Sequence, residues 1–396
     1  MGTVYYFVSN SFVWNDKIVP VILELARQGN KVYTVFEGSR GHQELRRAVP
    51  YYAWLERYTT IFPIYKTSKG LWGNIQRELR MAWLMFRMRF FKGYLAFFES
   101  KPVSMLRVLR FSNLAKAHGR SVLYSPRYAE YRNEIDEKAM VEACAKELKK
   151  GKISPVMDRK IYHKSHTFLA YHPELAGEAK SVGAQGVLLL HLPKLQAWWR
   201  SFVQATPPRY DIPELAEASE FIPVFLTHFG NCFFEDGSDL DSFVSDILMA
   251  IRQQYPDTLI VLKPKFTVDV GRLRKALPSG SLDNVVVSST PVSVLAEKAL
   301  FGVTVCQTSA QFEFLNSGKG WIEYCRYAGF WKQVYPQETY TTKFGGIYAR
   351  YFDELGEAID RATRTGYDLD AFKKMIGFVA QDIDFDFFTQ EPENIP

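Results

Sequence analysis

Hydrophobic and polar positions at the start of the chain predict parallel strands joined by a helix. Residues 4–8 are continuously apolar, as in a strand buried on both faces of a sheet. A helical spacing over residues 16–28 ends at Gly29, which suits a left-handed helix cap, and residues 31–36 form the next apolar strand. Residues 59–65 are a candidate third strand. No GxGxxG sequence follows the first strand, so a dinucleotide fingerprint is missing.

A long helix-forming run, residues 71–98, mixes basic and aromatic side chains. Arginines or lysine occupy positions 77, 80, 87, 89 and 92, among Trp83, Phe86, Phe90 and Phe91. We expect this helix to be buried in the first domain, with its arginines reaching the surface on their apolar stems. The alternative is a basic amphipathic helix that lies on an anionic membrane.

The remaining pattern divides the chain at a proline-rich segment. Before it we expect helices at 102–118, 132–150 and 194–203 and strands at 121–124 and 187–192, whereas residues 151–173 have no clear pattern. Residues 206–213 are the best linker candidate. Beyond them we expect strands at 221–227, 259–263, 285–288, 303–306 and 321–324, and helices at 240–255, 269–277, 292–299, 309–316, 352–365 and 367–381. This alternation predicts parallel sheets with right-handed crossovers.

The composition fits a folded protein of two domains. The chain has 396 residues, 47% of them hydrophobic and 23% charged, which exceeds one ordinary core. We expect a first domain at 1–205, a linker at 206–220 and a second domain at 221–366. A C-terminal helix and tail at 367–396 could pack back across the cleft between the domains.

Charge and cysteine usage narrow the class of protein. A net charge of +6 is modest and no recognition motif occurs, so nucleic-acid binding is not expected. Cysteines at 144, 232, 306 and 325 share no CxxC spacing, which argues against a disulfide scaffold or a zinc site. The N-terminus lacks a signal-peptide pattern, and the apolar run 81–86 is too short to span a membrane. We expect a cytoplasmic protein.

Candidate chemistry gathers where the predicted strands of the second half end, the edge at which open parallel sheets bind ligands. Four polar clusters lie there: residues 227–232, 263–266, 288–291 and 307–313. In the last cluster, Thr308 and Ser309 stand where a strand enters a helix, which predicts an anion site. Glu313, one turn later, can accept hydrogen bonds from ribose hydroxyls. The alternative is that Ser309 only caps its helix.

The second and third clusters also allow two interpretations. Ser288, Ser289 and Thr290 precede Pro291, so they can bind phosphate or cap a helix that starts with proline. Lys263 and Lys265 can neutralise a sugar carboxylate or a leaving phosphate, or they can be a solvated surface pair. Two α/β halves without a dinucleotide fingerprint suggest a nucleotide-sugar enzyme by analogy of fold.

No metal site is expected in either half. His163, His166 and His172 lie close in sequence, but no nearby carboxylate or cysteine completes a ligand set. The Asp-x-Asp triplets, 239–241 among them, are better explained by helix capping. In the first half, Asp158 stands beside two basic residues as a candidate acid.

The segments Thr227–Cys232, Lys263–Lys265 and Gln307–Glu313 resemble motifs of bacterial retaining β-Kdo glycosyltransferases. These enzymes transfer 3-deoxy-D-manno-oct-2-ulosonic acid (Kdo) from CMP-β-Kdo to capsule linkers or O-antigen ends. The resemblance spans the chain in length, but its specific motifs lie mainly at 221–325. It implies an α/β, modified GT-B architecture with two Rossmann-like domains. The active site would lie in the cleft between the acceptor-side first domain and the donor-binding second domain.

The resemblance also implies roles for single residues. Lys263, Lys265, Ser309 and Glu313 should hold CMP, and the rest of the predicted donor site is Asn231, Ser288, Ser289, Gln307, Thr308 and Gln311. The predicted catalytic group is Cys232, His228 and Asp158, the last as a base or cation stabiliser near the acceptor. The family carries a nucleophilic aspartate where Cys232 stands, and a carboxylate can attack the anomeric carbon and later leave. We hypothesise that Cys232 is an engineered substitution that impairs turnover or traps Kdo covalently.

The expected partners follow from the same resemblance. They are CMP-Kdo, a lipid-linked oligosaccharide acceptor, and further transferase modules after the linker-like residues 391–396. Peripheral contact with the inner face of the inner membrane is a further candidate. No cofactor is expected. One rival is an inverting sialyltransferase-like enzyme, although Glu235-Asp236-Gly237 and His172-Pro173 stand in the wrong order for it. The other rival is a non-catalytic module that associates with carbohydrate or membrane.

Overall fold

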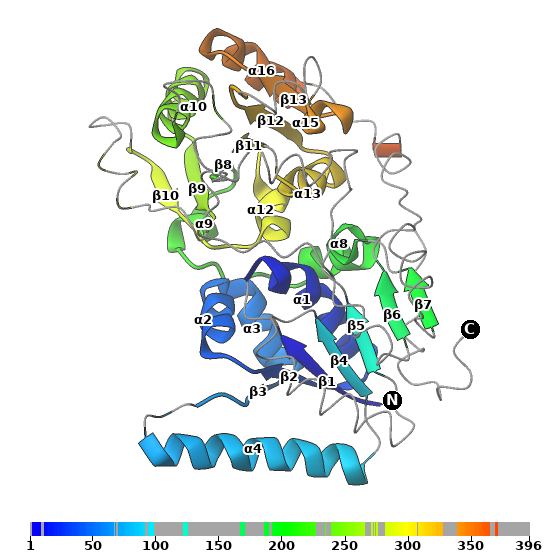
Figure 1. Cartoon of the computed structure of the whole chain (residues 1–396). Helices are drawn as coiled ribbons and strands as arrows, with labels where there is room; N and C mark the ends of the chain where they lie inside the picture. The colour runs from blue at the N-terminus through cyan, green and yellow to red at the C-terminus, as the bar shows by residue number, and fades with distance from the viewer. Residues whose placement is uncertain are drawn as a thin grey trace. The chain divides into compact units, whose positions relative to one another are not determined.

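The computed structural model divides into two compact units, which are described separately. It describes residues 2–8, 12–66, 68, 70–91, 94–98, 122–125, 167–170, 186–189, 192–226, 234, 239–265, 271, 273, 275, 282–306, 308–327, 339–364 and 369–370. Of these, residues up to Phe202 belong to unit 1 and those from Val203 onward to unit 2. Figure 1 labels the helices and strands.

Unit 1 contains a parallel sheet of seven strands in the order β3-β2-β1-β4-β5-β6-β7 (Figure 1). The strands are β1 (Thr3–Val8), β2 (Lys31–Phe36), β3 (Thr60–Pro63), β4 (Tyr94–Phe98), β5 (Val122–Ser125), β6 (Thr167–Ala170) and β7 (Gly186–Leu189). The predictions for the first three strands are confirmed within one or two residues. β6 was not predicted, and β4 corrects the predicted helix 71–98, whose last residues form a strand.

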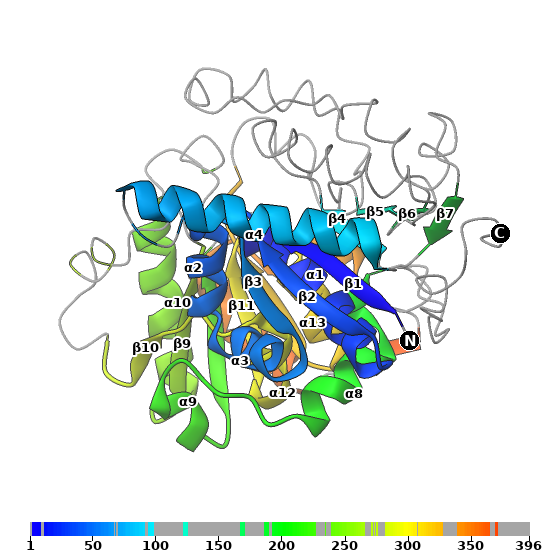
Figure 2. The same ribbon diagram turned by 90° about the horizontal axis from the view of Figure 1, so that it is seen from below.

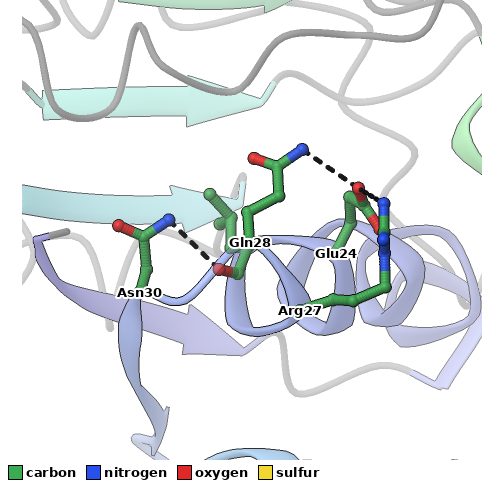
Figure 3. A network of polar contacts seen from close by, with 5 residues as sticks. Glu24, Arg27, Gln28 and Asn30 are labelled. Carbon is green, nitrogen blue, oxygen red and sulfur yellow. Dashed lines mark hydrogen bonds and ion pairs between the residues drawn. The ribbon is translucent and has the colours of Figure 1, made fainter.

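The first helix, α1 (Phe12–Arg27), ends as its sequence predicts. Gly29 has a φ of +87°, and its N–H donates to Ala26 O at 3.0 Å. Asn30 then donates its side-chain amide to Leu25 O, while its Oδ1 accepts the Gly2 N–H at 2.9 Å. Figure 3 shows this turn, where Glu24 also accepts from Arg27 and Gln28. These contacts fix the chain's reversal from α1 into β2.

Two helices without a predicted counterpart follow β2. These are α2 (Ser39–Arg47) and α3 (Val49–Tyr58), and they bury His42 between two tyrosine hydroxyls. His42 Nδ1 lies 2.7 Å from Tyr65 Oη, and its Nε2 lies 2.8 Å from Tyr52 Oη. Burial and the nearby Arg46 lower the pKa of His42, so the ring is held neutral as a structural link.

Helix α4 (Gly70–Phe90) has the opposite orientation from the one predicted. Two of its arginines point toward the rest of the unit: Arg80 Nη1 donates to Pro63 O at 3.0 Å, and Arg87 Nε donates to Tyr5 Oη at 3.4 Å. The ring of Trp83 stacks on Phe62 at a centroid distance of 4.9 Å. Large apolar side chains on the other side of the helix are exposed. In Figure 2 the helix crosses in front of β1–β3.

Unit 1 is completed by a short 3-10 helix, η2 (Pro193–Leu195), and α8 (Ala197–Ala205), which together replace the predicted helix 194–203. Trp199 of α8 is buried and packs edge-on against Trp54 of α3, at a centroid distance of 6.0 Å. Aromatic packing therefore forms much of this core.

Unit 2 contains a parallel sheet of six strands in the order β10-β9-β8-β11-β12-β13. The strands are β8 (Phe221–Leu226), β9 (Leu259–Pro264), β10 (Val285–Val287), β11 (Phe301–Val305), β12 (Gly320–Tyr324) and β13 (Ile347–Ala349). The helices are α9 (Pro213–Glu217), α10 (Leu240–Gln254), α12 (Val292–Lys298), α13 (Ala310–Asn316), α15 (Tyr340–Lys343) and α16 (Phe352–Arg364). The strand pattern beyond the proline-rich segment is confirmed, whereas β13 and α15 were not predicted.

Asp239 is the N-cap of α10, as predicted. Its Oδ1 accepts the Ser242 N–H at 2.9 Å, so the triplet 239–241 has a capping role here. The predicted helices 102–118 and 132–150, and most of 269–277 and 367–381, lie outside the described residues.

Candidate functional site

The strands of unit 2 end in one row at the carboxyl edge of the sheet. In the parallel register, Leu226 of β8 lies opposite Pro264 of β9 and Val305 of β11. The backbone N–H of Lys265 donates to Leu226 O at 3.0 Å, which extends the pairing by one residue. The carboxyl ends of these three strands therefore lie side by side.

The strand order reverses direction between β8 and β11. The chain adds β9 and β10 on one side of β8 and then places β11 on its other side. In open parallel sheets, ligands bind outside the carboxyl ends of the strands at such a reversal. The segments leaving the sheet here begin at Thr227 and Cys306, and they contain the first and fourth predicted clusters.

Several predicted site residues lie outside the described residues. These are His228, Asn231 and Cys232 after β8, Gln307 after β11, and Asp158 in the first half. Their predicted roles stay predictions.

Thr308 and Ser309 stand at the start of α13 and are both partly exposed. Ser309 occupies the N-cap position of α13 without a side-chain capping hydrogen bond, and its anion-binding role stays a prediction. Thr308 Oγ1 accepts the Ala310 N–H at a long distance of 3.5 Å. The helix dipole of α13 is weak because the helix has only seven residues. The two hydroxyls are therefore the stronger attraction for an anion.

Lys263 links the second and third clusters. Its Nζ donates to Ser289 O at 3.4 Å, which directs the ammonium group toward the end of β10. Lys263 and Lys265 are both partly exposed and carry positive charge at the row of strand ends. This edge of the sheet can therefore attract a phosphate or a carboxylate.

The third cluster already holds an anion from the chain itself. Asp211 Oδ1 accepts the hydroxyls of Ser288 at 2.6 Å and Thr290 at 2.7 Å, and Oδ2 accepts the Ser289 N–H at 2.5 Å. Ser288 and Thr290 are buried. A phosphate at this cluster would have to displace Asp211. The simplest role of the cluster is therefore to bind Asp211 and so anchor the segment before α9.

Gln311 and Glu313 are buried and join α13 to neighbouring helices. Thr341 of α15 donates to Gln311 Oε1 at 2.8 Å, and Ser293 of α12 donates to Glu313 Oε2. Glu313 is 3% exposed. Its predicted contact with ribose stays a prediction, and its visible partner is Ser293.

Comparison with known proteins identifies the architecture. Neither a protein-family model nor a curated protein matches the sequence. MnaA of S. aureus, solved with UDP, is similar over 97% of this chain and 99% of its own, with a TM-score of 0.51 and 11% identity. TcCGT1 in complex with UDP is similar over 95% and 93%, with a TM-score of 0.50 and 8% identity. The glycotransferase of kitacinnamycin is similar over 96% of this chain and 94% of its own, with a TM-score of 0.46 and 13% identity.

The chain has the GT-B fold. Identities this low establish the arrangement of two parallel Rossmann-like sheets and no activity. The predicted fold class is therefore confirmed, while donor, acceptor and mechanism are not determined by the comparisons.

Within this GT-B fold, Cys306 is not a second candidate nucleophile. It follows β11 with a φ of +64°, is fully buried, and its Sγ lies 3.2 Å from that of Cys325. Burial raises the pKa of both thiols, which keeps them protonated at neutral pH. No group of three His, Cys, Asp or Glu side chains gathers among the residues that the structure describes, and His163, His166 and His172 lie outside them.

Sequence reasoning missed two carboxylates in unit 2, the partly exposed Asp211 and the buried Glu323. Asp211 stands in a proline-rich stretch and gave no sign that it binds a cluster nearly eighty positions away. Glu323 lies inside the apolar strand β12 and accepts a hydrogen bond from Tyr327, with Thr339 and Thr341 also nearby. Asp211, and in part Glu323, were hidden because partners come from distant parts of the chain.

Proposed function

We propose that this protein is a glycosyltransferase that uses a nucleotide-activated sugar, with the nucleotide bound at the carboxyl edge of the unit 2 sheet. One observation carries the proposal. The two sequence clusters chosen for their chemistry, at 227–232 and 307–313, both begin at the strand-order reversal of a GT-B fold. Sequence chemistry and topology therefore indicate the same edge.

The side chains at this edge suit a phosphate-containing ligand. Lys263 and Lys265 supply positive charge at the end of β9, and Thr308 and Ser309 supply hydroxyl donors after β11, with β8 between the two strands. Charged and neutral donors of this kind stabilise a leaving phosphate without a metal.

The finer proposal is that the donor is CMP-β-Kdo and that transfer proceeds with retention through Cys232. It rests on the family resemblance of the motifs. The thiolate sulfur attacks the anomeric carbon, the bond from that carbon to the phosphate oxygen breaks, and CMP leaves. An acceptor hydroxyl then attacks the same carbon, the carbon–sulfur bond breaks, and a base, for which Asp158 is the candidate, takes the hydroxyl proton. A thiolate is a poorer leaving group here than a carboxylate, so the adduct should accumulate.

Nucleotide binding tests the general proposal. Calorimetry with CMP, UDP and dTDP should give one nucleotide with clear preference, and a Lys263→Ala/Lys265→Ala variant should bind it about tenfold or more weakly, as expected for lost charged contacts. Lys319→Ala is the matched control, because Lys319 precedes β12 at the opposite edge of the sheet. Absence of binding to all three nucleotides would overturn the proposal.

Mass spectrometry tests the finer proposal separately. After incubation with CMP-Kdo, the intact protein should gain one Kdo unit, and Cys232→Ala should not. Turnover by the native chain equal to that of Cys232→Asp would refute adduct trapping. A preference for UDP or dTDP, or transfer from CMP-sialic acid, would refute the Kdo donor and leave the general proposal standing.

A further inference from the structure

Helix α4 presents an apolar stripe to solvent. Trp72, Ile75, Leu79, Phe86 and Phe90 follow one another at intervals of three, four or seven residues, so they share one helix face. All five are exposed, with values of 62% for Trp72, 62% for Leu79 and 67% for Phe90. A monomeric soluble protein rarely leaves a contiguous apolar surface of this kind uncovered.

The inward face of α4 is fixed to the sheet of unit 1, so the stripe cannot turn inward. Leu84 is buried, and Trp83 stacks on Phe62 of β3. Arg87 reaches Tyr5 of β1, and its guanidinium also lies 4.6 Å from the ring centroid of Phe91. A Cβ on Gly73 would come within 2.0 Å of Ser68 O, so the start of the helix packs tightly against the preceding turn.

We propose that α4 docks unit 1 onto an anionic phospholipid membrane, with the stripe Trp72–Phe90 inserted at the headgroup boundary. The segment from 70 to 92 contains five basic residues and one acidic residue. Arg80 and Arg87 are held against unit 1, and the net positive charge of the segment complements an anionic surface. Tryptophan and phenylalanine side chains favour the membrane interface, and a helix of 21 residues gives a rod about 30 Å long lying in its plane. No helix of the described residues is long and apolar enough to cross a membrane.

A second copy of the chain fits the stripe less well. Pairing two α4 helices would bring two strongly basic segments together, and like charges facing each other are destabilising. A lipid surface covers the apolar side chains and also supplies the missing negative charge. The proposal does not depend on the proposed function, since it concerns only unit 1.

Vesicle flotation tests the proposal, because aggregated protein sinks and does not float. The full chain should float with vesicles of phosphatidylcholine and phosphatidylglycerol, and more weakly with phosphatidylcholine alone or at high salt. A Trp72→Ser/Leu79→Ser/Phe86→Ser variant should partition at least about tenfold more weakly, since three exposed apolar anchors are lost. Its thermal unfolding should match that of the native chain.

The matched control carries Met249→Ser and Tyr351→Ser, which remove exposed apolar side chains from unit 2. This variant should float like the native chain. The proposal is overturned if the native chain does not float, if the triple variant floats equally well, or if neutral and anionic vesicles bind equally. It is also overturned if the native chain is a dimer, the triple variant is a monomer and neither floats, because the occupant would then be a second copy.

Discussion

The two units differ in how many large apolar side chains they expose. Among the described residues, the large exposed apolar side chains of unit 1 all lie on α4 or at Phe91 beside it, whereas unit 2 exposes Met249 and Tyr351. Both units bury polar groups, among them Thr34 and His42 in unit 1, and those of unit 2 include Ser288, Thr290, Thr304, Gln311, Glu313 and Glu323. Most of these lie at or near the carboxyl edge of its sheet.

This contrast separates two kinds of signal. An exposed apolar face has no covering surface within the unit and indicates a binding partner outside the molecule. A buried polar group has its partner inside and fixes local geometry, often at the cost of stability. Unit 1 is therefore the place to look for docking, and unit 2 is the place to look for a preorganised ligand site.

The largest expected effect on the free energy of unfolding comes from substitutions in two amphipathic helices, α10 and α4. The apolar face of α10 is buried in the core of unit 2, where Ile247 is 1% exposed. Ile247→Ala should lower the free energy of unfolding by about 2–5 kcal/mol, because it leaves a cavity. Leu79→Ala on α4 removes a side chain of similar size and should change it by less than about 0.5 kcal/mol. Urea denaturation followed by circular dichroism measures both.

The control for this pair is Leu84→Ala, the buried residue on the same helix as Leu79. It should destabilise unit 1 clearly while Leu79→Ala does not. A large loss of stability from Leu79→Ala would mean that the stripe is already covered within the chain, and the contrast between the two helices would fail.

The same two helices mark how far sequence reasoning reaches. The apolar spacing predicted the position of α10 correctly, and the capping role predicted for the triplet 239–241 is confirmed at Asp239. In α4 the pattern predicted a helix, but its aromatic face was assigned to the core. Periodicity states that one face is apolar, and the tertiary fold decides where that face points. Arg80 and Arg87 found acceptors at Pro63 and Tyr5, which no local pattern encodes.

A moderate effect is expected at Asp211, the anion held by the third cluster. Asp211→Ala should lower the free energy of unfolding by about 1–3 kcal/mol, because the buried hydroxyls of Ser288 and Thr290 lose their acceptor. Asp211→Asn keeps one acceptor oxygen and should cost less. An inorganic phosphate titration monitored by thermal shift adds a second measurement, since the emptied cluster of the alanine variant should gain stability from phosphate. If the alanine variant is as stable as the native chain, the carboxylate does not anchor its segment.

The candidate site shows the same limit of sequence reasoning. Polar clusters at strand ends were identified because strand ends are visible in the sequence pattern, and the strand order then brought two of them to one reversal. The sequence pattern did not indicate which cluster is open to a ligand and which is bound by another part of the chain. Ser288 and Ser309 stand in similar sequence contexts, yet the first binds Asp211 and the second makes no capping bond.

The smallest effect concerns Glu323, the most deeply buried carboxyl of unit 2. Burial raises its pKa, and this outweighs the hydrogen bonds from Thr341, Tyr327 and Thr339 that lower it. The folded state therefore holds a proton that the unfolded state releases at lower pH, so this group's contribution is full below about pH 4 and is lost as the pH rises. Glu323→Gln removes the ionisation and should add on the order of 1 kcal/mol at pH 8. The gain should shrink toward pH 4 when thermal unfolding is followed across that range. A gain for Glu323→Gln that is constant with pH would mean that the carboxyl does not titrate inside unit 2, and its burial would carry no electrostatic cost.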